Sequence, residues 1–279
     1  MKKKKKLKTL SSKKLLLIKP YMDDLVSKIE QPTFIDNDPV QFMHAFEDKN
    51  DMELAGFFAA IMAWGRRDIV VAKVDELLNN MNYRPAEFIG NFTESDLDTF
   101  ANFKHRTFKP IDVYWLIKIL QQILNKYGDF EQFWKFCQIK AVEQQRELLA
   151  IFNEEFFSLQ PETPQRTGKH ISNPEKNSSC KRLNMYLRWC IRKSSVDLGT
   201  MDFITPAELH IPLDVHVARQ ARKLGLLSRT QNDWKAVLEL NTRLKILNPT
   251  DPTAYDFALF GIGVLKDSIP AEFIVNKVD

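Results

Sequence analysis

Helical periodicity along almost the whole chain is the feature that most limits how this sequence folds. From residue 15 to residue 275, apolar side chains recur at three- and four-residue spacing, and β-branched residues seldom alternate with polar ones. The chain of 279 residues contains only nine glycines, and no repeat of fixed period points to a solenoid. We therefore expect an all-α fold, a compact multi-helix protein.

Capping signals place several of the expected helices. Asp251 precedes Pro252 as an N-cap does, and Gly225 stands where a left-handed C-cap would end the helix that follows Asp214. Helices are expected at residues 15–30, 39–49, 51–64, 68–81, 111–126, 130–139, 141–157, 179–193, 215–224, 232–247 and 252–266. Two joints interrupt them, at residues 64–68 and at the polar, proline-containing run 160–177, which we expect to be a mobile segment or hinge.

Composition excludes several classes of protein. The chain is 44% hydrophobic and 27% charged, which is typical of globular proteins. No apolar run approaches the roughly 20 residues that span a bilayer, so we expect a cytoplasmic protein without a membrane partner. Cys137, Cys180 and Cys190 form no C-x-x-C pair, which argues against a disulfide framework, a zinc site or a four-cysteine iron-sulfur cluster. The sequence implies no metal and no cofactor, and it leaves the oligomeric state open.

Positive charge is concentrated in two places. Residues 1–14 hold eight lysines and no acid, so we expect a disordered polybasic tail, which either only solubilises the chain or adds affinity for polyanions. Residues 166–229 hold twelve Lys or Arg against five Asp or Glu, whereas the remainder of the body is acidic. Local basicity in an acidic body favours one anionic ligand, and phosphate is the obvious candidate.

The centre of this basic segment reads as an amphipathic helix at residues 179–193. Apolar residues recur from Leu183 at i, i+3, i+4, i+7 and i+8. The opposite face carries Lys181, Asn184, Arg188 and Arg192, with no acid in residues 180–193. This face either binds an anion or is a solvated basic surface.

The joint at residues 64–68 offers a second candidate anion site. Gly65 is expected to end one helix and Asp68 to cap the next, which leaves Arg66 and Arg67 at a helix N-terminus, where backbone donors favour an anion. An ordinary tight turn explains the glycine and the aspartate equally well. His105 and Arg106 lie in another polar joint, from which they either reach a phosphate or face water.

Two motifs resemble the helix-hairpin-helix superfamily of DNA base-excision glycosylases, which includes endonuclease III and 8-oxoguanine DNA glycosylase. Lys181-x-x-Asn184-x-x-Leu187 resembles the helix that begins with the family's catalytic lysine, and Leu213-Asp214-Val215-His216-Val217 resembles the segment with its catalytic aspartate. The resemblance implies a single glycosylase-like unit over residues 15–279, with two helical lobes and a cleft between them. Lobe one is expected at about residues 51–195, and lobe two at about residues 15–50 plus 196–279.

The chain is also similar, nearly end to end, to a bacterial family described only as a domain of unknown function and distantly related to those glycosylases. The motifs that carry this similarity are Gly65-Arg66-Arg67, His105-Arg106-x-Phe108, Cys180-Lys181-Arg182-Leu183-Asn184-Met185, Pro212-Leu213-Asp214-x-His216-Val217 and Tyr255-Asp256-Phe257-Ala258-Leu259-Phe260-Gly261. The glycosylase hairpin carries a G-x-G before the lysine, whereas this chain has Asn177-Ser178-Ser179-Cys180.

The resemblance implies a DNA-binding glycosylase and AP lyase. Lys181 would attack the sugar carbon that bears an extruded base and form a Schiff base, with neighbouring cations favouring its neutral amine and Asp214 as its charge partner. Asp214 fits a plain N-cap equally well. Nucleic acid would be held by Arg66, Arg67, His105, Arg106, Arg182, Arg188, Arg192 and Arg219. The alternative is a catalytically silent nucleic-acid-binding module of the same fold.

Overall fold

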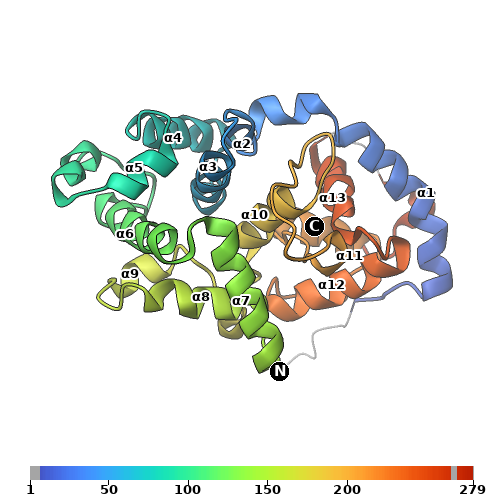
Figure 1. Ribbon diagram of the computed structural model, residues 1–279. Coiled ribbons are helices and arrows are strands. Elements are labelled where there is room, and N and C mark those ends of the chain that lie inside the picture. The colour runs from blue at the N-terminus through green and yellow to red at the C-terminus, as the bar shows by residue number, and fades with distance from the viewer. Residues whose placement is uncertain (1–6, 265–268, 279) are drawn as a thin grey trace, which may run out of the picture. The chain divides into compact units, whose positions relative to one another are not determined.

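The computed structural model of the chain describes residues 7–264 and 269–278, and every regular element within these ranges is a helix. The α-helices are α1 (Ser12–Ile29), α2 (Gln41–His44), α3 (Lys49–Met62), α4 (Arg67–Asn79), α5 (Pro85–Asn91), α6 (Pro110–Tyr127), α7 (Phe130–Gln144), α8 (Leu148–Ser158), α9 (Gln165–Gly168), α10 (Lys181–Ile191), α11 (Val215–Lys223), α12 (Trp234–Leu247) and α13 (Tyr255–Val264) (Figure 1). The all-α prediction is confirmed for these residues. None of their helices is both long and apolar enough to cross a bilayer.

The chain forms two units, and each is assembled from separate stretches of sequence. Unit 1 consists of Met1–Pro32, Pro174–Arg188 and Ile204–Asp279, and unit 2 consists of Thr33–Asn173 and Trp189–Phe203. These bounds differ from those of the expected lobes. Residues 33–50 fall in unit 2, because α2 packs against α3, and the boundary within α10 leaves residues 174–188 in unit 1.

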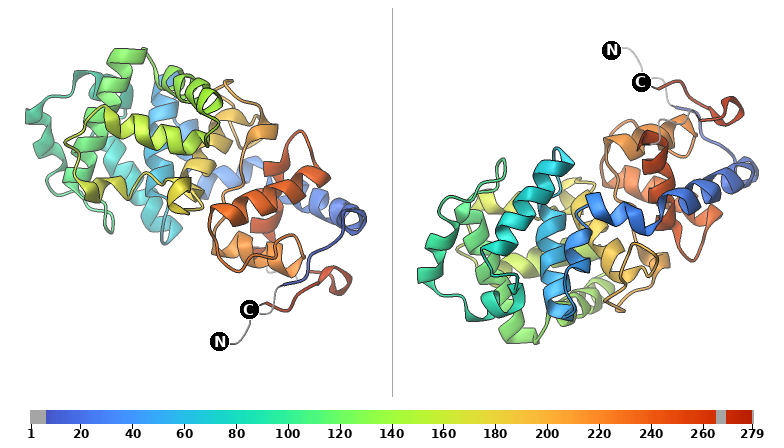
Figure 2. Two further views of the ribbon diagram at one scale, coloured as in Figure 1. Left: turned by 90° about the horizontal axis from the view of Figure 1, so that it is seen from below. Right: turned by 90° about the horizontal axis from the view of Figure 1, so that it is seen from above.

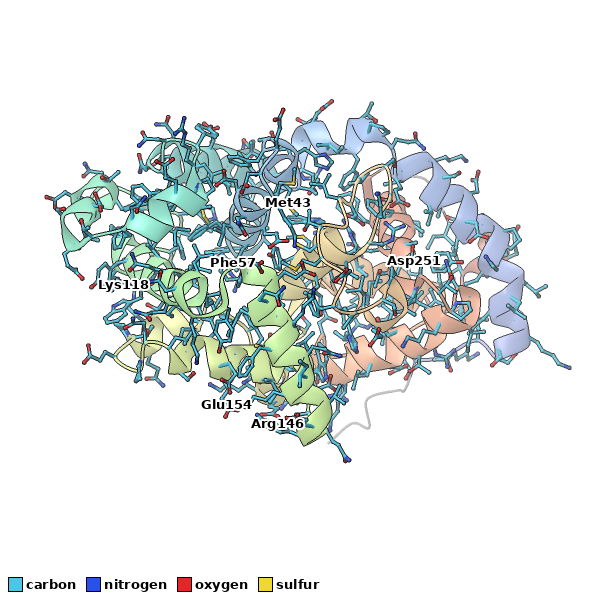
Figure 3. The ribbon with its side chains drawn as sticks, viewed as in Figure 1. Met43, Phe57, Lys118, Arg146, Glu154 and Asp251 are labelled. Carbon is cyan, nitrogen blue, oxygen red and sulfur yellow. The ribbon has the colours of Figure 1, made fainter. Side chains whose placement is uncertain are left out.

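Helix α3 is the centre of unit 2. Residues 53–62 are all buried, so the helix has no solvent-facing side beyond its first turn, and α2, α4, α5 and α7 pack around it. Gly56 permits the approach of α2, because a Cβ at this position would lie 2.5 Å from Met43 Cγ. Met43 on α2 and Phe57 on α3 are labelled in Figure 3.

Aromatic rings form the core between α3, α7 and α8. Phe57 meets Phe130 edge-on, with ring centroids 5.1 Å apart. Trp134 stacks on Phe152 with centroids 3.9 Å apart, and both rings are fully buried. Burial of such a side chain contributes about 1.5–3 kcal/mol, so this cluster contributes strongly to holding the three helices together.

Unit 1 is built around the packing of α1 on α12 and α13, and α11 also packs against α13 (Figure 2). The buried residues of α1 recur at three- and four-residue spacing and form one apolar stripe: Leu15, Ile18, Met22 and Leu25. Gly261 allows close approach of α1 to α13, because a Cβ there would lie 2.5 Å from Ile29 Cγ1.

The N-terminal segment corrects the expected disordered tail at residues 1–14. Its first six residues lie outside the described residues. Beyond them, Leu10 N donates to Gly225 O over 3.0 Å, Asn276 hydrogen-bonds both backbone groups of Lys8, and α1 already begins at Ser12. Residues 7–14 therefore belong to unit 1, because several of their backbone groups form hydrogen bonds with it. Only three of the eight lysines lie among these residues, so charge repulsion within this segment is smaller than the whole tail suggested.

Several expected elements have different bounds. The prediction of one helix over residues 141–157 was wrong: α7 ends at Gln144, Gln145 is left-handed with φ 52°, and α8 begins at Leu148. The joint at residues 160–177 contains α9 and buries Thr167 and His170. The end of the helix expected at residues 252–266 lies outside the described residues.

Candidate functional site

The turn before α10 is left-handed at two non-glycine residues. Asn177 has φ 59° and Cys180 has φ 49°. Asparagine tolerates this conformation, whereas for cysteine it costs about 1–2 kcal/mol. Ser178 Oγ accepts from Cys180 N over 3.2 Å, and the Asn184 amide donates to Ser179 O over 3.1 Å. Side-chain hydrogen bonds thus support a left-handed turn without the G-x-G, and this turn leads into α10 at Lys181.

Lys181 and Asp214 come from distant parts of the sequence and lie together in unit 1. Lys181 begins α10, and Asp214 is the N-cap of α11. Lys181 Nζ lies 3.6 Å from Asp214 Oδ2, and the two side chains are 33% and 25% exposed. Ser179 Oγ donates to Leu213 O over 3.1 Å, which ties the two segments together just before both residues. The pair is therefore accessible to a solute and positioned by its backbone.

The two carboxylate oxygens of Asp214 have different partners. Oδ1 accepts from His216 N over 2.8 Å and from Val217 N over 2.9 Å, which satisfies two free donors at the start of α11. Oδ2 faces the Lys181 amine. Asp214 thus caps a helix and also presents charge to a lysine, so the two roles weighed from the sequence are compatible.

Three further basic side chains lie near the pair in the sequence: Arg182, His216 and Arg219. Arg182 is half-buried, and burial lowers the pKa of its guanidinium to about 10, which still leaves it charged at neutral pH. His216 is exposed in the first turn of α11. Arg219, one turn further along, is half-buried, and its Nε has no hydrogen-bond partner within the described part of the chain. Of these, Arg182 and Arg219 belong to the predicted nucleic-acid-binding set.

Arg188 and Arg192, predicted to contact phosphates, are buried instead. Arg188 is 4% exposed, donates to Asp256 and lies with its guanidinium carbon 4.3 Å from the Phe257 ring centroid. Arg192 is 5% exposed and donates to Asp197 Oδ2 over 2.8 Å. Because Asp256 and Asp197 supply buried carboxylates, these two arginines lie in the interior and not on a solvent-exposed face. We therefore leave both arginines out of any phosphate-binding surface.

Arg66 and Arg67 lie at the N-terminus of α4, as the sequence predicts, and both have acidic partners. Arg66 is the N-cap and pairs with Asp68, Nη2 to Oδ2, over 2.6 Å. Arg67 Nη2 lies 3.5 Å from Asp38 Oδ2. Asp68 was expected to cap α4, but it lies in the first turn, and its carboxylate is engaged by Arg66.

His105 and Arg106 differ sharply in exposure. His105 is 2% exposed, and its Nε2 donates to Met62 O over 3.0 Å. Burial lowers the pKa of His105, so the imidazole is neutral at pH 7. Arg106 is exposed, with φ 54°. The histidine thus anchors the turn inside the protein, and the arginine is the accessible member of the two.

The sequence analysis missed a cluster in unit 2 in which two buried carboxylates, Glu53 and Glu131, lie near Lys49. Glu53 of α3 is fully buried, with an oxygen 3.5 Å from Lys49 Nζ. Lys49 also donates to Glu131 of α7, which accepts from Asp202 N over 2.9 Å. Burial raises the pKa of Glu53 to about 8. Burial acts in the same direction on Glu131, but its hydrogen bonds from Lys49 and Asp202 N outweigh it and hold that pKa at about 2. The i, i+4 spacing of Lys49 and Glu53 was the sole sequence signal.

A second missed group surrounds Asp112 in α6. Its carboxylate accepts from Thr167 Oγ1 over 2.8 Å, pairs with Arg166 Nη2 at 3.1 Å and lies 3.4 Å from His170 Nε2. Burial alone would raise the pKa of Asp112, but the nearby His170 ring and hydrogen bonds from Lys109 N and Thr167 Oγ1 hold it below its usual value. These contacts fix the joint after α8 onto α6. No periodic pattern relates Asp112 to Thr167, which is 55 residues away.

The fold and the site define an all-helical protein with an accessible lysine and aspartate pair in one of its two units. A family model described as a protein of unknown function (DUF2400) matches residues 38–265. The chain therefore belongs to the DUF2400 family, as its motifs indicated, and the match includes Lys181, Asp214 and Arg106. No curated protein and no solved structure matches the chain. The kinship with glycosylases stays a prediction from the motifs.

Proposed function

We propose that this protein binds DNA and acts as a base-excision glycosylase with AP lyase activity. Lys181 is the nucleophile and Asp214 is its charge partner. The observation that carries the proposal is the 3.6 Å separation of Lys181 Nζ and Asp214 Oδ2, two partly exposed groups that meet from separate segments. The resemblance of these two segments to the glycosylase motifs supports the same assignment.

The proposed reaction begins with attack of the neutral Lys181 amine on C1′ of an extruded nucleotide. The nitrogen forms a bond to C1′ while the glycosidic bond breaks. The electron pair of the glycosidic bond leaves with the base, which takes a proton from water. The proton shed by the nitrogen passes to Asp214 Oδ2. The C1′–O4′ bond then breaks, O4′ takes a proton from Asp214, and the nitrogen lone pair forms the Schiff base. Loss of a C2′ proton to water forms the C2′–C3′ double bond, and the 3′ phosphate leaves with the electron pair of the C3′–O bond.

The Asp214 carboxylate has a second task in this scheme. Positive charge develops on the sugar as the base departs, and a fixed anion beside it stabilises that charge. The hydrogen bonds of Oδ1 to the backbone of α11 hold the carboxylate in place. Asp214 is thus preorganised, because its position does not depend on the substrate.

Borohydride trapping tests the nucleophile. The protein is incubated with duplexes that contain an abasic site or oxidised guanine, and borohydride reduces any Schiff base to a stable covalent adduct. We expect an adduct with the wild-type protein and none with Lys181→Ala. Lys176→Ala is the matched control, because Lys176 is an exposed lysine in the same stretch and its loss removes the same charge.

Substitution of Asp214 separates capping from chemistry. Asparagine caps helices about as well as aspartate, so Asp214→Asn keeps the cap and removes the charge, whereas Asp214→Ala removes both. We expect both variants to lose about 10²–10⁴-fold in trapping rate, the range for a positioned proton-transfer group, and only Asp214→Ala to lose stability. Trapping by Asp214→Asn at the wild-type rate would mean that Asp214 acts only as a helix cap.

The silent nucleic-acid-binding module predicts a different outcome. In that case no lesion gives an adduct, and Lys181→Ala affects at most the affinity for undamaged duplex. Absence of an adduct together with unchanged binding by Lys181→Ala rules out the lyase mechanism. Affinity for duplex that does not change with salt concentration rules out phosphate-led binding altogether.

A further inference from the structure

A second basic surface lies in unit 2, away in sequence from Lys181. The 104–109 turn carries three exposed cations, Lys104, Arg106 and Lys109, and residues 99–111 contain no acid. None of these three side chains forms an ion pair or hydrogen bond with any residue in the described ranges. Most other arginines of unit 2 have carboxylate partners, so this cluster of unpaired charge stands out as a surface for an external anion.

The structure holds this turn rigidly from inside. His105 N donates to Phe108 O over 3.0 Å, and Phe108 N donates to His105 O over 2.8 Å, which closes the turn. The His105 ring is fixed to Met62 O at the end of α3. Arg166 donates to Thr107 O over 3.1 Å from the other side. Arg106 is thus presented on a turn that is bound to its surroundings on two sides.

The guanidinium of Arg106 rests against Gly65. A Cβ at Gly65 would lie 2.8 Å from both Cζ and Nε of Arg106, so the bare glycine makes room for this contact. Arg106 itself is left-handed, a conformation that glycine or asparagine adopts more readily. The turn would therefore form at least as well without arginine, and the side chain gains no ion pair by being there.

We propose that the 104–109 turn is a nucleic-acid-binding element in which Arg106 contacts a phosphodiester, with Lys104 and Lys109 adding positive charge. This inference rests on the proposed function in one respect, namely that the ligand is nucleic acid. A guanidinium matches two phosphate oxygens with parallel donors, which a lysine cannot do. His105 is neutral, so it positions Arg106 without adding charge.

Fluorescence anisotropy with an undamaged, labelled DNA duplex, measured from low to high salt, tests the inference. Arg106→Gly removes the guanidinium and relaxes the left-handed backbone, so the variant should fold as well as the wild type. One phosphate contact contributes a slope of about 0.9 in log affinity against log salt. We therefore expect a slope lower by about 0.9 and affinity about eightfold weaker at 0.1 M salt.

Two controls separate geometry from net charge. Arg84→Ala removes one exposed arginine from unit 2, outside the turn, and should change affinity less than twofold. Arg106→Lys leaves the net charge unchanged and removes the two parallel donors of the guanidinium, so it should weaken binding while thermal unfolding confirms a folded protein. Equal losses for Arg84→Ala and Arg106→Gly, or wild-type affinity for Arg106→Gly, overturn the inference.

The result is independent of the chemistry at Lys181. Binding that weakens in Arg106→Gly upholds the phosphate contact even where failure of borohydride trapping and unchanged binding by Lys181→Ala refute the lyase mechanism. Trapping by the wild type with unchanged binding in Arg106→Gly refutes the contact alone.

Discussion

Replacing Glu53 with glutamine should stabilise the protein by an amount that grows with pH. The Glu53 side chain is fully buried, and no described residue makes a hydrogen bond of good geometry to its oxygens, although Lys49 Nζ lies 3.5 Å away. Burial raises the pKa of Glu53 from 4.5 to about 8. In the unfolded chain the carboxyl ionises near pH 4.5, whereas in the folded protein it keeps its proton until about pH 8.

The sign of the effect follows from proton binding. Below pH 4.5 the carboxyl is protonated in both states, so it imposes no penalty on folding. Between that pH and about pH 8 the folded state holds the extra proton, so stability falls as pH rises. One pKa unit corresponds to about 1.4 kcal/mol, so the penalty reaches about 3 kcal/mol at pH 7 and about 5 kcal/mol above pH 8. Glu53→Gln removes this penalty.

Urea unfolding followed by tryptophan fluorescence, at intervals from about pH 5 to pH 9, measures the difference between the two proteins. We expect the stability advantage of Glu53→Gln to grow by about 1.4 kcal/mol per pH unit up to pH 8 and then to level off. Glu131→Gln is the control. Hydrogen bonds hold the pKa of Glu131 at about 2, so its loss should destabilise the protein throughout this range, by an amount that does not grow with pH because the Glu131 charge also helps to raise the pKa of Glu53. Parallel curves for Glu53→Gln and wild type would refute the reasoning.

Three further variants test the packing by urea unfolding. Arg188→Met leaves the Asp256 carboxylate without its arginine and should cost about 3–5 kcal/mol, most of which Asp256→Leu in the same chain should restore; no recovery would refute the buried pair. Phe152→Ala removes the ring stacked on Trp134 and should lower the free energy of unfolding by about 3–5 kcal/mol. A loss below about 1 kcal/mol would contradict the core described above. Arg146→Ala removes the partly exposed pair with Glu154, labelled in Figure 3, and a hydrogen bond to Gln144, and it should change stability by less than about 1 kcal/mol.

Helix ends were predicted correctly where neighbouring residues alone determine them. The cap at Asp214 was predictable because an aspartate before a helix accepts hydrogen bonds from the backbone N–H groups two and three residues on. Gly225 was predicted as a left-handed C-cap because glycine, which lacks a Cβ, adopts positive φ without strain, and its φ is 68°. The break at Gln145 was not readable, because a glutamine in the left-handed region leaves no glycine or proline as a signal.

Tertiary partners explain the predictions that failed. A helical wheel shows that Arg188 and Lys181 share a face, but it does not show that Asp256, 68 residues away, binds Arg188 in the interior. The burial of His105 depends in the same way on Met62, 43 residues earlier. The proximity of Lys181 to Asp214 was expected only through the motif resemblance, since composition and spacing do not bring the two segments together.

The division of each unit into separate stretches shapes how the chain folds as it is synthesised. Asp23 of α1 accepts a 2.7 Å hydrogen bond from Tyr255 of α13, 232 residues away. At about 5–20 residues per second, the ribosome needs roughly 10–50 s to make the intervening chain. During that time most of unit 2 is complete, while the apolar stripe of α1 has no partner. Helix α1 is thus a substrate for a holding chaperone until its partners are made, and assembly of unit 1 waits for α13.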